Sequence, residues 1–414
     1  MINLFYDCYR VLNKVYGEGA YLKRALLDVD IEEKNRAATT KICYGVLDKD
    51  YELSYAIKYL APKTPKAAVR TVLKTAMYTY KYLGKKPYAV ADAAVELVKK
   101  LGKGGAAGFV NAFLRKYFKT DIPLPEEISE RLSVQYSYPL FAVKELLKEY
   151  GKERAEKIVS AENCKTTLAF YGTDGAEYLK NLGAEYEKTP FDNVFTLKNF
   201  VRNEDYDKGV YTYQALPSVA ICEVVEPCEK LLDCCAAPGG KSVRLSFKCK
   251  EIMAWDVHPH RVELISAYKR RMGRENIKEE ARDATEFHAE YADKFDAVLC
   301  DCPCSGTGVI NDNPDIKLNR EAEDVVSLVK TQSAILDNAA KYVKKGGYLY
   351  YSTCSVLKSE NSDRADEFLK GRDDYEICPI NSPLPHEDKN GANAFLPDIS
   401  GGLGFFVAKF KRVK

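Results

Sequence analysis

Residues 231–241 read LLDCCAAPGGK, an apolar run followed by a turn of small residues that contains Gly239 and Gly240. An apolar run that leads through such a turn into a helix is typical of a strand–turn–helix unit. Glycines at this turn let the backbone approach a ligand closely, which suits a nucleoside with a charged tail. A plain tight turn without a ligand is the alternative. The spacing differs from G-x-G-x-x-G, so NAD is disfavoured, and a G-x-x-x-x-G-K-[ST] phosphate loop is absent.

The alternation of apolar runs and helical patterns continues on both sides of this stretch. Four runs read as strands, at 230–233, 251–256, 295–301 and 347–352. Strands separated by helices pair in parallel, so the sequence predicts a doubly wound, Rossmann-like α/β domain over residues 211–414. Its ligands should bind beyond the carboxyl ends of the strands. The helical patterns begin at Lys241, end at Met272 and span Val325 to Val343.

Two acids follow the next two strands. Asp256 ends EIMAWD, where a carboxylate can accept hydrogen bonds from both ribose hydroxyls of a nucleoside. A cap for the following helix is the alternative reading of Asp256. Asp283, in ARDAT, could meet an adenine amino group. Together with the glycine turn, these acids favour a nucleoside without phosphates, and S-adenosylmethionine is the candidate.

Two cysteine-containing loops follow later strands. Residues 295–308 read FDAVLCDCPCSGTG and residues 347–355 read GYLYYSTCS, so Cys304 and Cys354 each follow a strand end. Zinc sites favour C-x-x-C spacing and a second pair, which are missing, so no metal is expected. A cysteine at a strand end can simply be a small buried hydrophobe. Two of them on neighbouring loops instead indicate one pocket at the strand ends.

Methylation of a pyrimidine carbon requires such a pocket. Carbon 5 of cytosine is a poor nucleophile, but thiolate attack at carbon 6 turns the ring into an enamine that takes a methyl group at carbon 5. Protonation or hydrogen bonding at N3 assists the attack and is a task for an acid such as Asp301. A second cysteine could assist the final release of the adduct.

The N-terminal part has a different pattern. From Leu4 to Phe118 the apolar residues recur at helical spacing, which predicts an all-α bundle over residues 1–120. These residues carry 22 Lys and Arg against 11 Asp and Glu, whereas the rest of the chain carries 40 against 49. A basic face of this kind suits a polyanion, although a solvated helical surface explains the charge equally well. DIPLP at 121–125 marks a boundary, and residues 121–210 read as a linker and mixed α/β subdomain.

The bulk composition fits an ordered protein of at least two domains, because 414 residues exceed what one core usually organises. No window is apolar enough for a membrane span and the N-terminus carries charges, so we expect a cytoplasmic protein without a membrane partner. The 13 cysteines are scattered and odd in number, which favours reduced thiols.

These motifs together resemble the RNA (cytosine-5) methyltransferases, specifically the Sun/Fmu (RsmB) type of 16S rRNA methyltransferase. NPDIK (313–317), SVLKSEN (355–361) and GFFVAKF (404–410) are also similar to that type, and residues 1–120 resemble its N-terminal NusB-like RNA-binding domain. The resemblance implies Cys354 as nucleophile, Cys304 as the thiol that aids release, and Asp301 at the methyl-transfer end. It also implies donor contacts from Cys235, Ala236, Ala237, Pro238, Gly239, Gly240, Lys241, Asp256, Asp283 and Asp301.

The implied partner is small-subunit ribosomal RNA, with no DNA expected. Alternatives are a 5-methylcytosine methyltransferase for another RNA such as tRNA, a non-catalytic NusB-like RNA-binding factor, and a methyltransferase for proteins or small molecules. Two segments depart from the family pattern: 213–218 (YQALPS) lacks an acid after its glutamine, and 164–172 (CKTTLAFYG) lacks an arginine and an asparagine.

Overall fold

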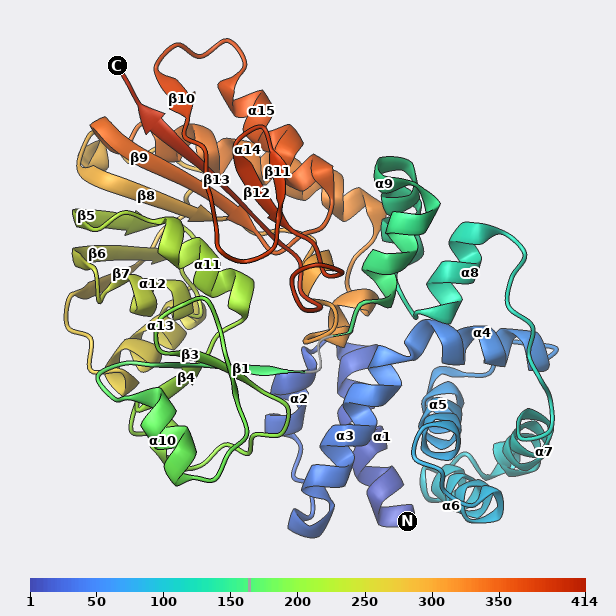
Figure 1. Cartoon of the computed structure of the whole chain (residues 1–414). Coiled ribbons are helices and arrows are strands. Elements are labelled where there is room, and N and C mark those ends of the chain that lie inside the picture. The colour runs from blue at the N-terminus through green and yellow to red at the C-terminus, as the bar shows by residue number, and fades with distance from the viewer. Residues whose placement is uncertain (163–164) are drawn as a thin grey trace. The chain divides into compact units, whose positions relative to one another are not determined.

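The computed structural model describes residues 1–162 and 165–414, which form two compact units (Figure 1). The helical unit comprises Met1–Ser160 and Ile310–Glu321. The second unit comprises Ala161–Val309 and Ala322–Lys414; because it contains the glycine turn and both cysteine motifs predicted to form the site, we name it the catalytic unit. The three-domain division with boundaries near residues 120 and 210 remains our proposal for the functional domains. Cys164, at which the departing segment 164–172 begins, lies outside the described residues.

The helical unit is all-α up to Ser160, as its apolar spacing predicts. Buried residues of its first seven helices form one core, which includes Val69, Val72, Leu73 and Ala76. Within the described ranges, no helix is long and apolar enough to cross a membrane. The helices are α1 Ile2–Glu18, α2 Leu22–Asp28, α3 Arg36–Asp48, α4 Asp50–Leu60, α5 Ala67–Lys81, α6 Pro87–Lys100, α7 Ala107–Tyr117, α8 Ile128–Gln135 and α9 Leu140–Ser160.

A distant segment of chain, residues 310–321, completes the helical unit. It contains the short 3-10 helix η6 (Pro314–Leu318) and the NPDIK motif. Lys317 is 3% exposed, and its Nζ donates to the backbone oxygen of Asp48 at 2.7 Å and pairs with Asp48 Oδ1 at 3.1 Å. The Asp315 carboxylate accepts from the backbone N–H of Leu22, at the start of α2. The motif therefore belongs to the helical unit although a long stretch of the catalytic unit precedes it.

The catalytic unit begins with a small antiparallel sheet, the mixed part of the sequence. Its strand order is β2-β3-β1-β4, and helix α10 (Gly175–Asn181) accompanies it. TTLAF and VFTL, which read as strand-like, are β1 and β3. The four strands are β1 Thr166–Phe170, β2 Glu187–Lys188, β3 Val194–Leu197 and β4 Tyr211–Tyr213.

The large sheet of the catalytic unit has the order β11-β12-β13-β9-β8-β5-β6-β7, with β10 paired to β13. Strands β7, β6, β5, β8 and β9 are mutually parallel, and β13 runs antiparallel to β9. The strands are β5 Cys228–Asp233, β6 Cys249–Asp256, β7 Ile277–Ala281, β8 Phe295–Asp301, β9 Val343–Thr353, β10 Tyr375–Ile377, β11 Glu387–Lys389, β12 Ala392–Phe395 and β13 Phe405–Arg412. The helices are α11 Leu216–Val224, α12 Gly240–Leu245, α13 Pro259–Arg271, α14 Ala322–Ala340 and α15 Ser362–Leu369.

The strand order reverses between β5 and β8, because the chain lays down β6 and β7 on one side of β5 before it returns to β8 and β9 on the other. Such a reversal opens a crevice at the carboxyl ends of the strands. The Rossmann-like fold predicted for the C-terminal part is confirmed. One boundary is wrong: the helix expected to reach Val343 ends at Ala340, and Val343 is the first residue of β9.

Candidate active site

The glycine turn after β5 leads directly into α12. Gly239 has φ +105° and precedes Gly240, the first residue of the helix. A Cβ atom on Gly239 would lie 3.3 Å from the backbone Cα of Ile265 in α13, and its φ is unfavourable for other residues. Packing and backbone conformation thus require this glycine, and the turn carries Lys241 into the crevice.

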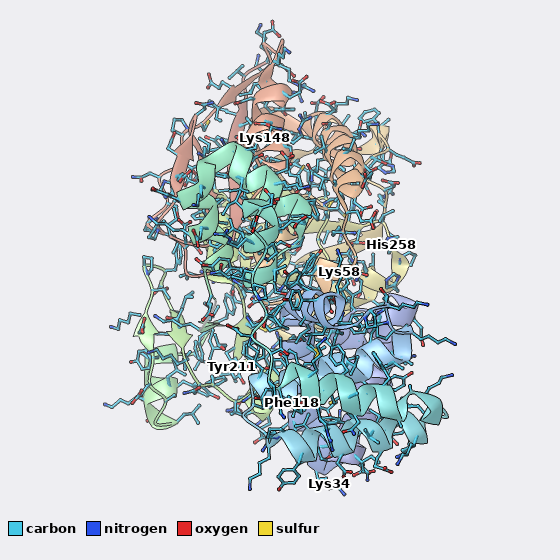
Figure 2. All side chains as sticks on the ribbon, turned by 90° about the vertical axis from the view of Figure 1, so that its right-hand side faces the viewer. Lys34, Lys58, Phe118, Lys148, Tyr211 and His258 are labelled. Atoms are coloured by element: carbon cyan, nitrogen blue, oxygen red, sulfur yellow. The ribbon has the colours of Figure 1, made fainter. Side chains whose placement is uncertain are left out.

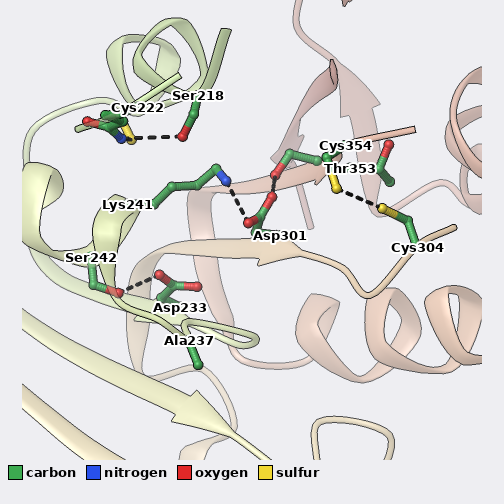
Figure 3. Close-up of polar contacts among 12 residues, drawn as sticks. Ser218, Cys222, Asp233, Ala237, Lys241, Ser242, Asp301, Cys304, Thr353 and Cys354 are labelled. Carbon is green, nitrogen blue, oxygen red and sulfur yellow. Dashed lines mark hydrogen bonds and ion pairs between the residues drawn. The ribbon is translucent and has the colours of Figure 1, made fainter. Parts of the chain in front are cut away.

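Lys241 and Asp301 form the charged centre of the site (Figure 3). The Lys241 ammonium lies 2.6 Å from Asp301 Oδ2, and Ser352 Oγ donates to Asp301 Oδ1 at 2.7 Å. Burial opposes the charge on Lys241, but the Asp301 carboxylate outweighs burial and raises the pKa of the ammonium group. Residues from the start of α12 and from the ends of β8 and β9 therefore meet at one point.

Asp233, the last residue of β5, is a second acid at this end of the sheet. It is fully buried, and its Oδ2 accepts a hydrogen bond from Ser242 Oγ at 2.6 Å. Its Oδ1 has no hydrogen-bond partner among the described residues. Burial raises the pKa of Asp233 to about 7 because the carboxylate is removed from water.

Asp256 and Asp283 follow β6 and β7, in line with the glycine turn along the sheet edge. Asp256 is 3% exposed; it accepts from the backbone N–H of His258 at 3.2 Å and lies 3.5 Å from the Arg261 guanidinium. The contact with His258, which precedes α13, resembles the helix-cap reading of this acid. Asp283 Oδ1 accepts from the backbone N–H and the hydroxyl of Thr285.

The two cysteines predicted to act together lie side by side (Figure 3). Cys304 Sγ and Cys354 Sγ are 3.2 Å apart, with Cys304 buried and Cys354 half-buried. The hydrogen bond to Cys354 and burial raise the pKa of the Cys304 thiol well above its ordinary value. The more exposed thiol, Cys354, follows β9 directly.

Two glycines bring the thiol loops this close. The Gly308 N–H donates to the Cys354 backbone oxygen at 2.9 Å, and the Gly404 N–H donates to the Gly308 oxygen at 2.7 Å. A Cβ atom on Gly308 would lie 2.1 Å from the Gly404 oxygen and 2.8 Å from the Cys354 oxygen. The loops after β8 and β9 and the start of β13 thus meet through backbone contacts that only glycine allows.

Among the other cysteines of the strand-end motifs, Cys234, Cys300 and Cys302 are buried, whereas Cys235 in the glycine turn is half-buried. Burial raises the pKa of Cys234, Cys300 and Cys302 well above the ordinary value. In the part of the chain that the structure describes, no group of three or more His, Cys, Asp and Glu side chains could hold a metal ion.

Four polar residues around the thiol loops have no role in the motifs predicted from the sequence: Ser305, Gln332, Glu360 and Asn361. Glu360 and Gln332 are fully buried, Asn361 is 5% exposed, and all three bond residues next to the cysteines; Ser305 forms two of these bonds. Glu360 and Asn361 end SVLKSEN, a run noted only as a likeness to the family. A Glu–Asn pair directly after the second cysteine motif was the available signal.

The helical unit exposes many basic side chains, among them Lys34 and Lys58, which Figure 2 labels. Exposed lysines also follow α4, at Lys63 and Lys66, before α5 begins. The excess of positive charge in this part of the chain therefore lies largely in water, where a polyanion can reach it.

A parallel sheet that reverses beside a glycine turn, with acids at its successive strand ends, defines a Rossmann-like methyltransferase. Residues 222–411 match the family described as 16S rRNA methyltransferase RsmB/F, and residues 8–119 match the NusB family. A relative from Bacillus subtilis (strain 168), named probable ribosomal RNA small subunit methyltransferase B, is 32% identical, with 94% of each chain covered. The chain belongs to the RsmB/F family of 16S rRNA methyltransferases and carries its NusB domain.

Two solved structures share the fold. The crystal structure of PH0851 is similar over 100% of this chain and 99% of that chain, with a TM-score of 0.84 and 22% identity. The structure of NSun6 from Pyrococcus horikoshii with SFG has a TM-score of 0.59 and 19% identity, and covers 67% of this chain and 99% of that chain.

Proposed function

We propose that the protein methylates carbon 5 of a specific cytosine in 16S ribosomal RNA through a covalent bond between Cys354 and carbon 6 of the base. The observation that supports this most is the 3.2 Å separation of the Cys304 and Cys354 sulfurs, beside the Lys241–Asp301 pair. Methylation of a nitrogen or an oxygen needs no thiol, whereas activation of carbon 5 does.

In the first step the Cys354 thiolate attacks carbon 6, and the electron pair of the C5–C6 double bond becomes available at carbon 5. Cys354 is the more exposed of the two thiols, so the base can reach it. Asp301 is positioned by Lys241 and Ser352. Because N3 of cytosine only accepts, Asp301 would donate to it as the carboxylic acid, while its other oxygen would accept from the 4-amino group, and both bonds would stabilise the ring during attack.

The methyl donor is S-adenosyl-L-methionine, whose sulfonium supplies an electrophilic methyl group when bound. The contacting residues would be 235–241, with Asp256 at the ribose, Asp283 near adenine and Asp301 at the methyl-transfer end. The strand ends fit such a nucleoside: an acid lies at or just after the end of each of the four neighbouring strands β8, β5, β6 and β7, and Asp233 Oδ1 is a buried acceptor without a partner among the described residues. The mechanism requires no metal.

Release completes the cycle. The proton on carbon 5 is lost to water, its electron pair re-forms the C5–C6 double bond, and the C6–S bond breaks with its electrons on Cys354. Cys304, whose raised pKa keeps it as a thiol, can donate its proton to the departing sulfur across 3.2 Å. Without this donor the adduct should persist.

The RNA would be held by the basic helical unit, and the target cytosine would be an unpaired or flipped-out nucleotide. A base inside a helical stack cannot place carbon 6 against a thiol. Single-stranded or looped RNA is therefore the expected partner, and DNA is not.

The decisive experiment measures transfer of labelled methyl groups from S-adenosylmethionine to unmodified small-subunit ribosomal RNA by the full chain. Wild-type protein should yield 5-methylcytosine, and Cys354→Ala should reduce the yield to background. Cys378→Ala, a half-buried cysteine of the catalytic unit outside the site, is the matched control and should retain activity.

A denaturing gel distinguishes the mechanism from its rivals. Cys304→Ala should accumulate a protein–RNA adduct that Cys304→Ala/Cys354→Ala lacks. Methylation of another base or atom would refute the proposed chemistry. Methylation of tRNA in place of ribosomal RNA would keep the chemistry and change the assigned substrate. RNA binding without methyl transfer would favour the non-catalytic RNA-binding factor.

A further inference from the structure

We propose that Glu360 and Asn361, adjacent in sequence, are positioning residues that each hold one thiol loop, and that the Glu360 carboxylate makes the two thiols chemically unequal. This inference rests on the proposed function for the roles of Cys304 and Cys354. The contacts that support it all lie within the catalytic unit.

Glu360 holds the loop of Cys304 on both sides of the cysteine. Its carboxylate accepts from the backbone N–H of Ser305 at 2.8 Å and from the Ser305 hydroxyl at 2.5 Å. It also accepts from Gln332 Nε2 at 3.1 Å, and the same nitrogen donates to the Pro303 oxygen at 2.9 Å. The residues before and after Cys304 are thus tied, directly or through Gln332, to one side chain.

Asn361 holds the loop of Cys354 in the same way. The Thr353 hydroxyl donates to Asn361 Oδ1 at 2.5 Å, and Asn361 Nδ2 donates to the Ser355 oxygen at 2.9 Å. These partners flank Cys354. Two consecutive residues therefore bracket both thiol loops, and the loops also meet directly through the hydroxyls of Ser305 and Ser355, 3.3 Å apart.

Glu360 is fully buried, and among the described residues its carboxylate has hydrogen-bond donors and no ion-pair partner. Its three donors are neutral, so they stabilise the negative charge without cancelling it. Burial of a charge without a counter-charge is costly, and the amide oxygen of a glutamine could accept the bonds from the Ser305 N–H and from Gln332 without carrying a charge. Hydrogen bonding to the loop therefore does not explain why the residue at position 360 carries a charge.

The charge acts on Cys304, because Glu360 binds Ser305, the next residue in the chain. After the hydrogen bond to Cys354 and burial, the charges of Cys354 and Glu360 also raise the pKa of Cys304. Tyr351 from β9 donates its hydroxyl to the Glu360 backbone oxygen, and, after burial, Cys302, Glu360, Cys304 and Arg364 all act on the pKa of Tyr351. Cys304 is thereby kept as a thiol that can donate its proton, while Cys354 is left to attack.

Thiol labelling tests the charge without RNA or donor, and therefore independently of the proposed function. Peptide-level mass spectrometry after brief treatment with methyl methanethiosulfonate gives the pH at which each thiol reacts at half its maximal rate. In Glu360→Gln this pH should fall for Cys304 by about one unit or more relative to wild type. Asp363→Asn, which neutralises an acid in α15 outside this hydrogen-bond network, is the matched control and should leave it unchanged. An unchanged Cys304 profile in folded Glu360→Gln would overturn the charge role.

The rate of adduct formation tests whether Asn361 positions the loop of Cys354. In the Cys304→Ala background, Asn361→Ala should lower the rate of adduct formation by about 10-fold or more with little change in the concentration of RNA needed for half-maximal rate. Asn361→Asp keeps the acceptor for Thr353 and should recover part of this rate. Equal rates in all three proteins would overturn the positioning role. If the Cys304→Ala parent itself forms no adduct, the proposed function fails, whereas the labelling result still decides the charge on Glu360.

Discussion

Asp233 lies at the end of β5, and its carboxyl group accepts a hydrogen bond from the Ser242 side chain. Because burial raises its pKa to about 7, the folded protein holds this proton over a range in which the unfolded chain, with a pKa of about 3.9, has lost it. The contribution to the free energy of unfolding is thus fully present below about pH 4 and is lost as pH rises through about 7. The difference corresponds to roughly 4 kcal/mol.

We expect Asp233→Asn to flatten the pH dependence of the urea midpoint of the catalytic unit between about pH 4 and 8. Thermal or urea denaturation at several pH values measures this. The control is Asp363→Asn, because Asp363 is an exposed acid of the same unit. This variant should keep the wild-type dependence of the urea midpoint on pH. A wild-type slope in Asp233→Asn would show that this carboxyl is not the titrating group.

At the same scale, the sequence predicts which residue types meet but not all of their partners. Asp301, Cys304 and Cys354 could be placed together because each follows a strand of one parallel sheet. The bonds of Gln332 and Glu360 to the Cys304 loop join residues 29 and 55 positions apart, and no periodicity encodes such contacts. The ligand roles of Asp256 and Asp283 stay predictions.

At the scale of elements, the approach of the loops after β8 and β9 to the start of β13 depends on Gly308. Gly308→Ala would push a methyl group to 2.1 Å from the Gly404 oxygen, and since both atoms belong to backbones, one loop must move. We expect the catalytic unit to lose about 1–3 kcal/mol of stability and methyl transfer to fall more than about ten-fold.

Denaturation and the methyl-transfer assay measure both effects. Gly17→Ala in α1 is a suitable control, because a Cβ there meets nothing within 4 Å and alanine favours a helix. Wild-type activity in Gly308→Ala would mean that the loops do not need this close approach.

The boundaries of strands and helices could be predicted where the sequence contains a clear turn signal. The parallel strands β5, β6 and β8 could be recognised because each apolar run ends at an acid and a turn. The start of β9 was missed: its first residues, Val343 to Gly347, contain two lysines and two glycines and read as a turn, yet Val343 pairs with Phe295 across an irregularity in the ladder. Pairing across a sheet overrides local propensity there.

At the scale of the whole molecule, the separation of charge predicts a salt-dependent grip on RNA. Lys58, Lys63 and Lys66 are exposed near the end of α4 and the loop before α5. Changing all three to Gln should weaken RNA binding and reduce the slope of log affinity against log salt by about 0.7 for each RNA phosphate that is no longer neutralised. Fluorescence titration at several salt concentrations measures the slope.

The matched control changes three exposed lysines of the catalytic unit, Lys345, Lys370 and Lys414, to Gln. It should leave the slope close to that of wild type. A larger effect in the control than in the test protein would place the electrostatic contact outside the helical unit.

The second prediction at this scale concerns Lys317, because this residue joins a late segment of the chain to the helical unit. Its side chain is 2% exposed and pairs with Asp48, which is itself partly solvated. Lys317→Ala removes this pair and the packing of the aliphatic stem, so the amides of α3 should exchange with a loss of roughly 2–3 kcal/mol of protection.

Hydrogen exchange of α3 measures that loss. Lys23→Ala, which removes an exposed hydrogen bond to Asn313, should change protection by less than about 0.5 kcal/mol. Equal protection in Lys317→Ala and wild type would mean that the segment contributes nothing to the unit.

Because residues 310–321 fold with the helical unit, the chain passes from one unit to the other three times, after Ser160, after Val309 and after Glu321. End-to-end fusion of two independent modules would leave one such passage. A chimera that exchanges only the first 160 residues with a relative would therefore keep a foreign strip inside the new bundle. A chimera that replaces the helical unit must therefore replace residues 310–321 together with the first 160 residues.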